Sequence, residues 1–247
     1  MEKKPIGNTV KWFGELKSTN DYATSIAHFD GSHGIVIASE FQSQGRGQRG
    51  NQWESEKGEN LLFSIVLHPR FLEVRNQFLL SKAIALSLCD VLSVFTNGVS
   101  IKWPNDIYIG NKKVAGILIE HSFSSIYLDT TIIGVGLNVN QSVFLSSAPN
   151  PTSLYLEFGQ NFDIAVLLNS VCNAFNKRYA EVEANQYRIS ENYLQNLFRY
   201  EVFHKYRALD QMFTAKIIGV RNSGELMLQT IEGERLEFAF KEIEYVL

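Results

Sequence analysis

The chain has 247 residues, of which 45% are hydrophobic and 20% are charged, and its formal net charge at pH 7 is −3. These values are typical of a soluble globular protein with one large domain, or with one large and one small domain. The net negative charge argues against a surface devoted mainly to nucleic acid, because such surfaces carry an excess of lysine and arginine.

The distribution of polar residues also argues against export and membrane insertion. The first residues, MEKKPIGNTVKWFGELKSTND, contain charges where a signal peptide would need an unbroken apolar core. The most apolar run, Phe78–Phe95, contains Lys82 and Asp90 and therefore predicts a buried core helix. Cys89 and Cys172 match no metal-ligand spacing. We expect free core thiols in a cytoplasmic protein without a membrane segment.

The apolar periodicity predicts an irregular alternation of helices and strands. A short helix is expected from Ser18 or Thr19, either of which is a good N-cap. The next elements are a strand at 34–39, a glycine-rich loop, a strand at 61–68 and a long helix at about 76–95. A meander of strands follows over 99–140. Two helices come after it, and the first has the apolar stripe Ile164, Leu167, Leu168, Val171, Phe175 and Tyr179.

The last fifty or so residues differ in character from the rest. Short apolar runs at 213–220, 224–231, 235–240 and 242–247 are separated by turn residues, with no helical pattern between them. They predict a small all-β module, for which a barrel is one arrangement. We place the domain boundary between 1–198 and 199–247.

The stretch GRGQRGNQW, from Gly45 to Trp53, contains a literal G-x-G-x-x-G. A dinucleotide-binding fingerprint needs its first glycine at the end of a strand and its third at the start of a helix. Here the strand candidate Gly34–Ser39 is followed by the polar run EFQSQ, and no helical period follows Gly50. A protein-kinase glycine loop is disfavoured as well, since the chain has no H-R-D or D-F-G stretch.

What remains is a glycine-rich loop between two strands that carries Arg46, Arg49 and Trp53. Two guanidinium groups and an indole suit an anionic ligand with a flat ring. A flexible surface turn is the alternative, and the loop alone does not separate the two interpretations.

The second cluster of polar residues is KWPNDIYIGNKKVAGILIE, from Lys102 to Glu120. Pro104 cannot donate to a sheet ladder, so a strand ends there and the chain turns at Asn105 and Asp106. Lys102 and these two residues are therefore expected at a strand end, where polar side chains can reach a ligand.

A hairpin after this turn would return Lys113 toward the same edge, if its strands pair across the IGNK turn. The lysine precedes VAG, which reads as the start of a buried strand. Its side chain either extends its ammonium to solvent or is held for an anion. The sequence leaves both interpretations open.

Taken in order, GRGQRGNQW, KWPNDI, KVAGILIE and GVGLNVN resemble the motifs of the biotin protein ligases. The resemblance extends from Ser18 to the C-terminal β module. It implies an α/β (α+β) fold, with a mixed-sheet catalytic domain like that of the class II synthetases and a small SH3-like β-barrel. It also implies the reaction, in which biotin and ATP form biotinyl-adenylate and pyrophosphate, and the biotinyl group is then transferred to a lysine of a carrier protein.

The resemblance implies a set of biotin-binding residues. Ser18, Thr19, Asn20 and Gln42 would bond to the ureido ring or lie near it, although Ser18–Asn20 also read as a helix N-cap. Gly116 and Gly134 would leave room for biotin, because a side chain there would fill the space of the ring or its acyl chain. The full set is Ser18, Thr19, Asn20, Gln42, Gly45, Arg46, Gly47, Gln48, Lys113, Gly116 and Gly134.

The resemblance also implies catalytic and nucleotide-binding residues. Lys113 and Arg46 are the catalytic candidates, and Lys113 would hold the biotin carboxylate and then the α-phosphate. Trp53 would stack near adenine and Asn138 would bond to its edge. Asp106 would be an oxygen ligand for the Mg²⁺ that accompanies ATP. The full nucleotide set is Arg49, Trp53, Lys102, Asn105, Asp106 and Asn138.

Two residues depart from the family pattern. Gln48 and Asn51 stand where arginine is frequent, so the loop carries less positive charge toward the adenylate. The implied partner is the biotin carboxyl carrier domain of a carboxylase, and the implied assembly is a monomer or weak homodimer. We expect no DNA partner, because the segment before Ser18 is too short for a helix-turn-helix.

Two other functions compete with this one. A lipoate ligase or transferase shares the implied fold and the acyl-adenylate chemistry, but its motifs lack KWPND. A biotin sensor without catalysis is the second alternative. Lys113, Arg46 and Asp106 argue against a sensor, since it would not need the phosphate side of the site.

Overall fold

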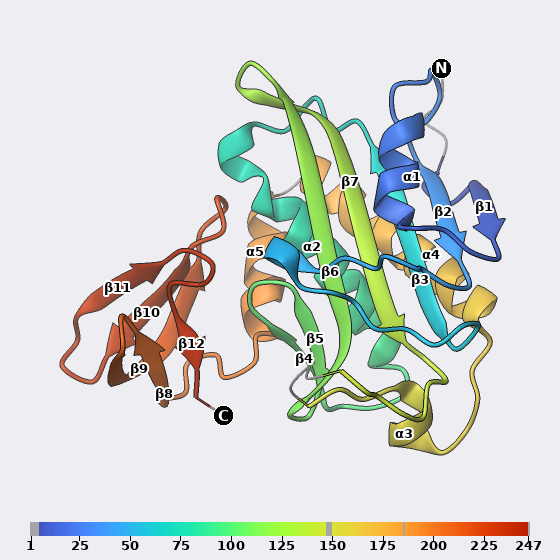
Figure 1. Ribbon diagram of the computed structural model, residues 1–247. Helices are drawn as coiled ribbons and strands as arrows, with labels where there is room; N and C mark the ends of the chain where they lie inside the picture. Colours follow the sequence, from blue (N-terminus) through green and yellow to red (C-terminus); the bar gives the residue numbers. More distant parts are fainter. Residues whose placement is uncertain (1–4, 147–149, 185, 247) are drawn as a thin grey trace.

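The computed structural model describes residues 5–146, 150–184 and 186–246 (Figure 1). Within them the chain forms one large mixed sheet, one small antiparallel sheet and a set of helices. This is the predicted α/β architecture. No helix of the described residues combines the length and the apolar character needed to cross a bilayer.

The large sheet has the strand order β1-β2-β3-β7-β6-β5-β4 over the described residues. Its β1–β2 pair is parallel and the other pairs are antiparallel. The strands are β1 (Thr9–Phe13), β2 (Ile35–Ser39), β3 (Asn60–Leu67), β4 (Val99–Lys102), β5 (Asp106–Ile109), β6 (Lys112–Ser124) and β7 (Tyr127–Asn138).

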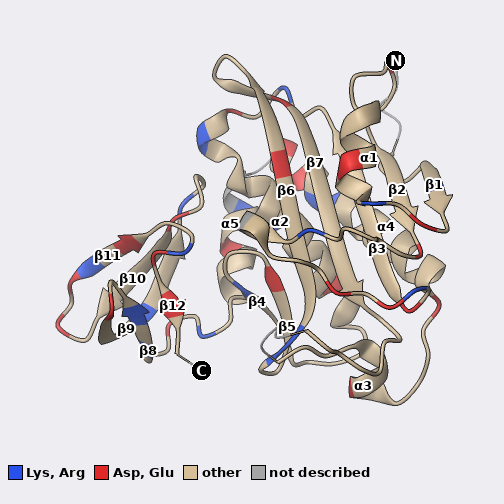
Figure 2. Cartoon of the chain, viewed as in Figure 1, with Lys and Arg blue, Asp and Glu red and all other residues tan. Residues whose placement is uncertain are grey.

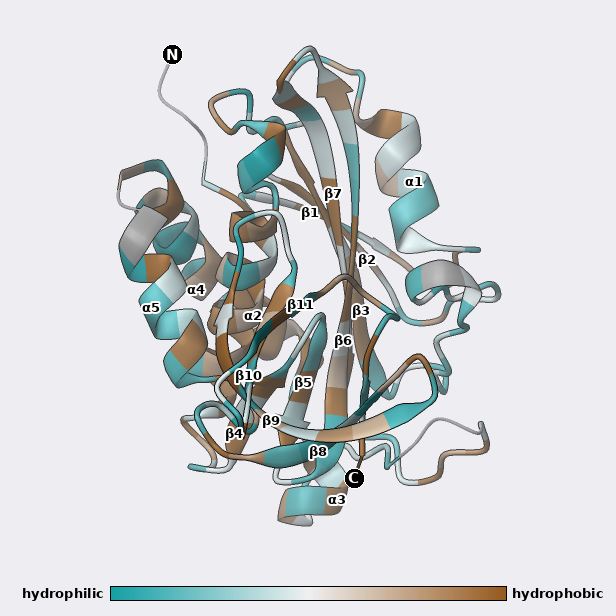
Figure 3. Ribbon diagram, turned by 90° about the vertical axis from the view of Figure 1, so that its left-hand side faces the viewer, coloured by the Kyte–Doolittle hydropathy of each residue, from teal (hydrophilic) through white to brown (hydrophobic). Residues whose placement is uncertain are grey.

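Helices lie on both faces of this sheet, as Figure 3 shows from the side. On one face lies α1 (Thr19–Ile26), and on the other lie α2 (Phe78–Leu92), α4 (Ile164–Ala184) and α5 (Gln186–Gln195). Successive side chains of a strand point to opposite faces of the sheet. In β2, Ile37 packs in the small cluster beneath α1, whereas its neighbour Val36 belongs to the main core on the other face. Because α1 is short, part of its face of the sheet stays uncovered.

The predicted helix N-cap is present at the start of α1. Ser18 has an extended backbone, and its side chain accepts a hydrogen bond from the backbone N–H of Asp21. Short elements complete the large unit: the 3-10 helices η1 (Gln48–Gly50) and η2 (Val74–Asn76), and α3 (Leu154–Phe158).

The small sheet has the order β11-β10-β9-β8-β12 over the described residues. Its strands are β8 (His204–Ala208), β9 (Gln211–Val220), β10 (Leu226–Thr230), β11 (Arg235–Phe238) and β12 (Glu244–Tyr245). The module docks beside α2 and α5 (Figure 1). The predicted boundary at 198/199 falls between α5 and β8.

Two strands of the structure have no counterpart in the sequence prediction. The edge strand β1 has no fully buried residue, and β8 buries Tyr206 alone among its residues. Neither carries the apolar run that identified the other strands. β1 is an edge strand with few neighbours to pack against, whereas β8 lies between β9 and β12 but exposes Lys205 and Arg207. The β8 strand falls inside the C-terminal unit predicted over 199–247.

Candidate active-site cleft

A cleft of about 1070 Å³ opens on the α1 face of the large sheet. It lies between α1, the glycine-rich loop and the last residues of the C-terminal module. Most of the predicted site residues line it: Ser18, Thr19, Asn20, Gln42, Arg46, Gly47, Gln48, Trp53, Lys102, Asn105, Asp106, Lys113, Gly116 and Gly134. We call the part near Ser18–Asn20 the α1 end, and the part near Lys102, Asp106 and Lys113 the hairpin end.

The floor of the cleft is made by glycines of β6 and β7. Gly116 and Gly136 are opposite each other in the sheet, and the Trp53 indole extends over both. A Cβ atom added to Gly116 would lie 2.7 Å from Trp53 Cζ3, and one added to Gly136 would also collide with the ring. The glycines therefore allow the indole to reach the sheet backbone.

Gly134 of β7 likewise leaves room for a neighbouring side chain. A side chain at this position would collide with the amide of Asn20, which lies directly above it. In this structure the space above Gly134 is thus taken by Asn20, and the space above Gly116 by Trp53. The sequence interpretation, in which both glycines face a ligand, overlooked these two side chains.

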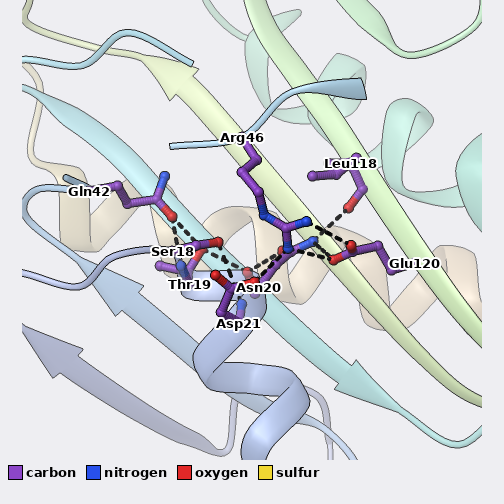
Figure 4. Close-up of polar contacts among 9 residues, drawn as sticks. Ser18, Thr19, Asn20, Asp21, Gln42, Arg46, Leu118 and Glu120 are labelled. Carbon is purple, nitrogen blue, oxygen red and sulfur yellow. Dashed lines mark hydrogen bonds and ion pairs between the residues drawn. The ribbon is translucent and has the colours of Figure 1, made fainter. Parts of the chain in front are cut away.

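A hydrogen-bond network fixes the α1 end of the cleft (Figure 4). Gln42 Oε1 accepts from the backbone N–H of Thr19 at 2.7 Å and from its hydroxyl at 3.0 Å. Asn20 Nδ2 donates to Glu120 Oε2 at 2.7 Å, and Asn20 Oδ1 accepts from the Ser64 hydroxyl at 2.6 Å. These groups are neutral, apart from Glu120, and their rotamers are held by one another.

Arg46 of the glycine-rich loop is paired with two carboxylates. Its Nη2 lies 2.6 Å from Asp21 Oδ1 and 3.2 Å from Glu120 Oε2, and its Nη1 lies 3.1 Å from Glu120 Oε1. Acidic residues are found on both α1 and β6 (Figure 2), and Figure 4 shows the guanidinium between them. Asp21 and Glu120 were missed in the sequence. The signal for Glu120 is a carboxylate that directly follows the apolar run VAGILI within one strand.

Lys113 lies at the hairpin end and forms an ion pair with Asp106, with 2.7 Å between Nζ and Oδ1. Its ammonium is 5.5 Å from the centre of the Trp53 ring. A bulge in β6, where Tyr108 pairs with Lys113 and Ile107 with Ala115, turns Lys113 toward the face of Gly116. The structure therefore favours a held ammonium over one that extends to solvent.

Lys102 brings a second ammonium to the hairpin end. It lies 5.3 Å from the Tyr108 ring centre and 5.2 Å from that of Tyr245. Burial lowers the pKa of Lys102, the nearby Asp106 carboxylate opposes this shift, and Lys113 adds to it. Tyr245 belongs to the C-terminal module, so this unit contributes to the cleft, a role that the sequence analysis did not assign to it.

Asn105 is held by the hairpin itself. Its Nδ2 donates to the backbone carbonyl of Ile117 at 2.9 Å, and its own carbonyl accepts from the Ile117 N–H at the same distance. These contacts are those of a residue that stabilises the turn, which is the position that the sequence predicts for Asn105.

Three predicted site residues do not line the cleft with a described side chain. Gly45 packs against the Trp53 carbonyl, where an added Cβ would lie at 2.7 Å. Asn138 is buried, its Nδ2 donates to the Thr152 carbonyl at 2.9 Å, and its Oδ1 has no hydrogen-bond partner among the described residues. The side chain of Arg49 lies outside the described part of the chain.

Over residues 5–146, 150–184 and 186–246, no group of three or more His, Cys, Asp or Glu side chains is arranged to hold a metal ion. Asp106, the predicted Mg²⁺ ligand, is one carboxylate beside two lysines. That set fits an ion that arrives with a phosphate, because Mg²⁺ is often bound through one or two carboxylates plus substrate oxygens.

The sequence pattern of the Biotin/lipoate A/B protein ligase family matches residues 12–138. The chain belongs to this family. The match runs from the end of β1 to the end of β7, and it includes α1, the glycine-rich loop and the β4–β7 strands that build the cleft.

Two relatives of this chain carry names that describe ligases. It is 28% identical over 245 residues to the bifunctional ligase/repressor BirA of Bacillus subtilis, covering 94% of this chain and 73% of that protein. It is 32% identical over 173 residues to the biotin--[acetyl-CoA-carboxylase] ligase of Paracoccus denitrificans, covering 67% of this chain and 71% of that protein.

Solved structures agree with the architecture. The biotin protein ligase from Aquifex aeolicus in complex with biotin and ATP superposes with a TM-score of 0.80 at 26% identity, over 97% of this chain and 100% of that one. The similarity spans both sheets, so the small C-terminal sheet is part of the shared fold.

Proposed function

We propose that this family member is an ATP-dependent biotin protein ligase. The biotin carboxylate attacks the α-phosphorus of ATP, the bond to the β-phosphate breaks, and biotinyl-5'-AMP and pyrophosphate form. The ε-amino group of a lysine on a biotin carboxyl carrier domain then attacks the acyl carbon. AMP leaves, and a proton is lost as the amide forms.

The observation that carries this proposal is the gathering of amide and hydroxyl groups at the α1 end of the cleft and of two lysine ammonium groups at the hairpin end. At the α1 end, Thr19, Asn20 and Gln42 offer amide and hydroxyl groups of the kind that a ureido ring can bond. At the hairpin end, Lys102 and Lys113 offer ammonium groups to carboxylate and phosphate oxygens.

Lys113 and Arg46 are the two residues we assign to the reacting anions. Each is held by protein carboxylates in this structure, Lys113 by Asp106 and Arg46 by Asp21 and Glu120. The charges are thus oriented before a ligand arrives. Preorganised cations lower the repulsion between a carboxylate and a phosphate and stabilise charge that develops at phosphorus.

The Trp53 indole is assigned to the nucleotide base. It is supported from below by Gly116 and Gly136, and its Nε1 is buried without a hydrogen-bond partner among the described residues. A flat ring with an unused donor suits stacking against a purine and bonding to one acceptor. Asp106 is assigned to the Mg²⁺ that accompanies ATP.

The partner we propose is the biotin carboxyl carrier domain of a biotin-dependent carboxylase. The names of the Paracoccus relative and of a Mycobacterium tuberculosis relative refer to acetyl-CoA carboxylase. A catalytic unit over 1–198 and a C-terminal β unit over 199–247, acting as a monomer or weak homodimer, remain part of the proposal.

Pyrophosphate release with biotin or with lipoate tests the reaction. A biotin ligase releases pyrophosphate with biotin, a lipoate ligase releases it with lipoate, and a biotin sensor binds biotin and releases none. Mass spectrometry of a carrier domain incubated with the protein, ATP, Mg²⁺ and biotin should then show one biotinyl addition on one lysine. Absence of both signals with biotin would refute the proposal.

A further inference from the structure

Lys82 is a buried lysine of α2 whose ammonium reaches the C-terminal module. Its side chain is 1% exposed. Nζ donates to Ser190 Oγ at 3.0 Å, to the Val220 carbonyl at 3.2 Å and to Asn222 Oδ1 at 2.9 Å. These acceptors lie in α5, at the end of β9 and in the loop after it, so one side chain joins three segments.

All three acceptors are neutral groups, and burial lowers the pKa of Lys82 to about 8. A buried ammonium without a counter-ion is unfavourable, and an apolar side chain of similar size is often neutral or stabilising at such a place. Stability alone therefore does not account for a lysine here. The geometry of its three bonds is what an apolar side chain could not supply.

The loop held by Lys82 also contacts the hairpin that builds the cleft. The Asn222 carbonyl accepts from the backbone N–H of Phe78 at 3.0 Å, and the Gly224 carbonyl accepts from Trp103 Nε1 at 2.9 Å. Gly224 has φ +121°, and a Cβ atom there would lie 3.2 Å from the Phe78 ring. The loop is thus fitted closely to α2 and to the KWPND segment.

From Trp103 the contacts continue into the cleft. The Phe240 ring packs edge-on against Trp103, with 6.3 Å between ring centres. The segment 240–245 then lines the hairpin end and places Tyr245 beside Lys102. The position of the C-terminal module relative to α2 therefore determines the wall that faces Lys102.

We infer that Lys82 is a positioning residue for the nucleotide side of the cleft. It clamps the loop 220–224 against α2, and through Trp103 and Phe240 it holds the segment 240–245 over Lys102. The assignment of this side to the nucleotide rests on the proposed function. The α1 end is built without the C-terminal module, so loss of the clamp affects ATP and leaves biotin binding unchanged.

Steady-state pyrophosphate release by Lys82→Met tests the inference. We expect the KM for ATP to rise about fivefold, the effect of losing one or two hydrogen bonds that fix a wall. The KM for biotin should stay within about twofold. Asn222→Ala removes an acceptor on the module itself and should shift the KM for ATP in the same direction, which keeps the test open if Lys82→Met does not fold.

Two controls separate positioning from general destabilisation. Lys216→Met removes a lysine of the same module whose ammonium lies over the Phe203 ring. Val171→Ala opens a cavity in the core at a fully buried position of α4. Neither should change the ratio of the two KM values. Equal increases of the KM for ATP and the KM for biotin in Lys82→Met would overturn the inference. So would a rise of the KM for ATP alone in Val171→Ala.

Hydrogen exchange gives a readout that does not depend on activity. In Lys82→Met, amides of 220–224 and 240–245 should exchange faster than in the parent, while β3 and β7 keep their protection. If the parent releases no pyrophosphate with biotin, the proposed function fails and exchange alone decides about the clamp. Unchanged exchange in both segments would overturn it.

Discussion

Lys113 Nζ lies 2.7 Å from Asp106 Oδ1, so the strongest candidate for the catalytic cation already has a carboxylate partner. We expect Lys113→Ala to fold and to lose adenylate formation by a factor on the order of hundreds, the scale for removing one preorganised charge donor. Single-turnover pyrophosphate release measures this. Lys112→Ala is the matched control, because Lys112 is exposed and pairs with Glu157.

A parent-like rate in Lys113→Ala would exclude this lysine from the chemistry. A loss in both variants would point to a disturbed hairpin, which thermal unfolding of the two proteins would reveal. The ratio of their rates is therefore the informative quantity.

A ligand anion would compete with Asp21 and Glu120 for the Arg46 guanidinium. Removing one competing carboxylate should therefore favour binding. We expect Asp21→Asn to tighten biotin binding about twofold to fivefold, since exposed ion pairs are worth roughly 0.2–1 kcal/mol. Isothermal titration with biotin measures the change. Glu120 is less suitable for this substitution, because it also holds Asn20.

Asp163→Asn is the control for this prediction. Its carboxylate likewise stands at the start of a helix, where it accepts from the backbone N–H of Val166 at 3.0 Å. It should leave biotin affinity unchanged. Weaker binding in Asp21→Asn would mean that this carboxylate supports the ligand-bound position of Arg46.

The neighbourhood of Lys113 and Asp106 could be predicted because it depends on local pairing. Pro104 ends one strand, the IGNK turn reverses the chain, and the two residues return to one edge. The contact of Trp53 with Gly116 could not be predicted in this way. It depends on the path of a long loop across the sheet, and a loop sequence specifies its local turns better than its destination.

The contribution of Tyr245 to the cleft is a second feature that could not be predicted from the sequence. The C-terminal module was identified from its short strands, but its docking depends on tertiary contacts such as that between Trp103 and Gly224. Lys82 was noticed only as an interruption of an apolar run. Its partners come from α5 and the β9–β10 loop, more than a hundred residues away in sequence, and no periodicity connects them.

Lys82 also predicts a pH dependence of stability. Burial lowers its pKa to about 8 in the folded chain, whereas an unfolded lysine keeps its ordinary value of 10.5. Between these values the unfolded state binds more protons, so the free energy of unfolding contributed by this group rises with pH. Between about pH 7 and pH 9 the rise is about 1.3 kcal/mol.

Urea unfolding of the parent and of Lys82→Met at these two pH values measures the difference. The parent should gain stability relative to the variant as the pH rises. Burial raises the pKa of Tyr108 and Tyr206 to about 12, so buried tyrosines act in the opposite direction above about pH 10 and the comparison stays below it. Parallel pH profiles would show that Lys82 stays protonated, held by its three acceptors.

Gln48 lines the cleft at the start of η1, and its Oε1 is buried without a hydrogen-bond partner among the described residues. An arginine there could form a charge-assisted bond with a bound phosphate, whereas glutamine offers a neutral amide. The difference is about 1 kcal/mol, or roughly fivefold. We expect Gln48→Arg to slow the release of biotinyl-adenylate several-fold and to leave biotin affinity nearly unchanged.

Stopped-flow displacement of the adenylate by excess biotin measures this release, since affinity differences between related complexes appear mainly in the off-rate. Gln44→Arg is the matched control: Gln44 lies in the same loop, is exposed and does not line the cleft, so it adds the same charge at a distance from the ligand. Arg46→Gln should act in the opposite sense, with faster release and weaker biotin binding. Equal slowing by Gln48→Arg and Gln44→Arg would assign the effect to net charge. An unchanged off-rate in Gln48→Arg would show that this side chain turns away from the phosphate when the adenylate is bound.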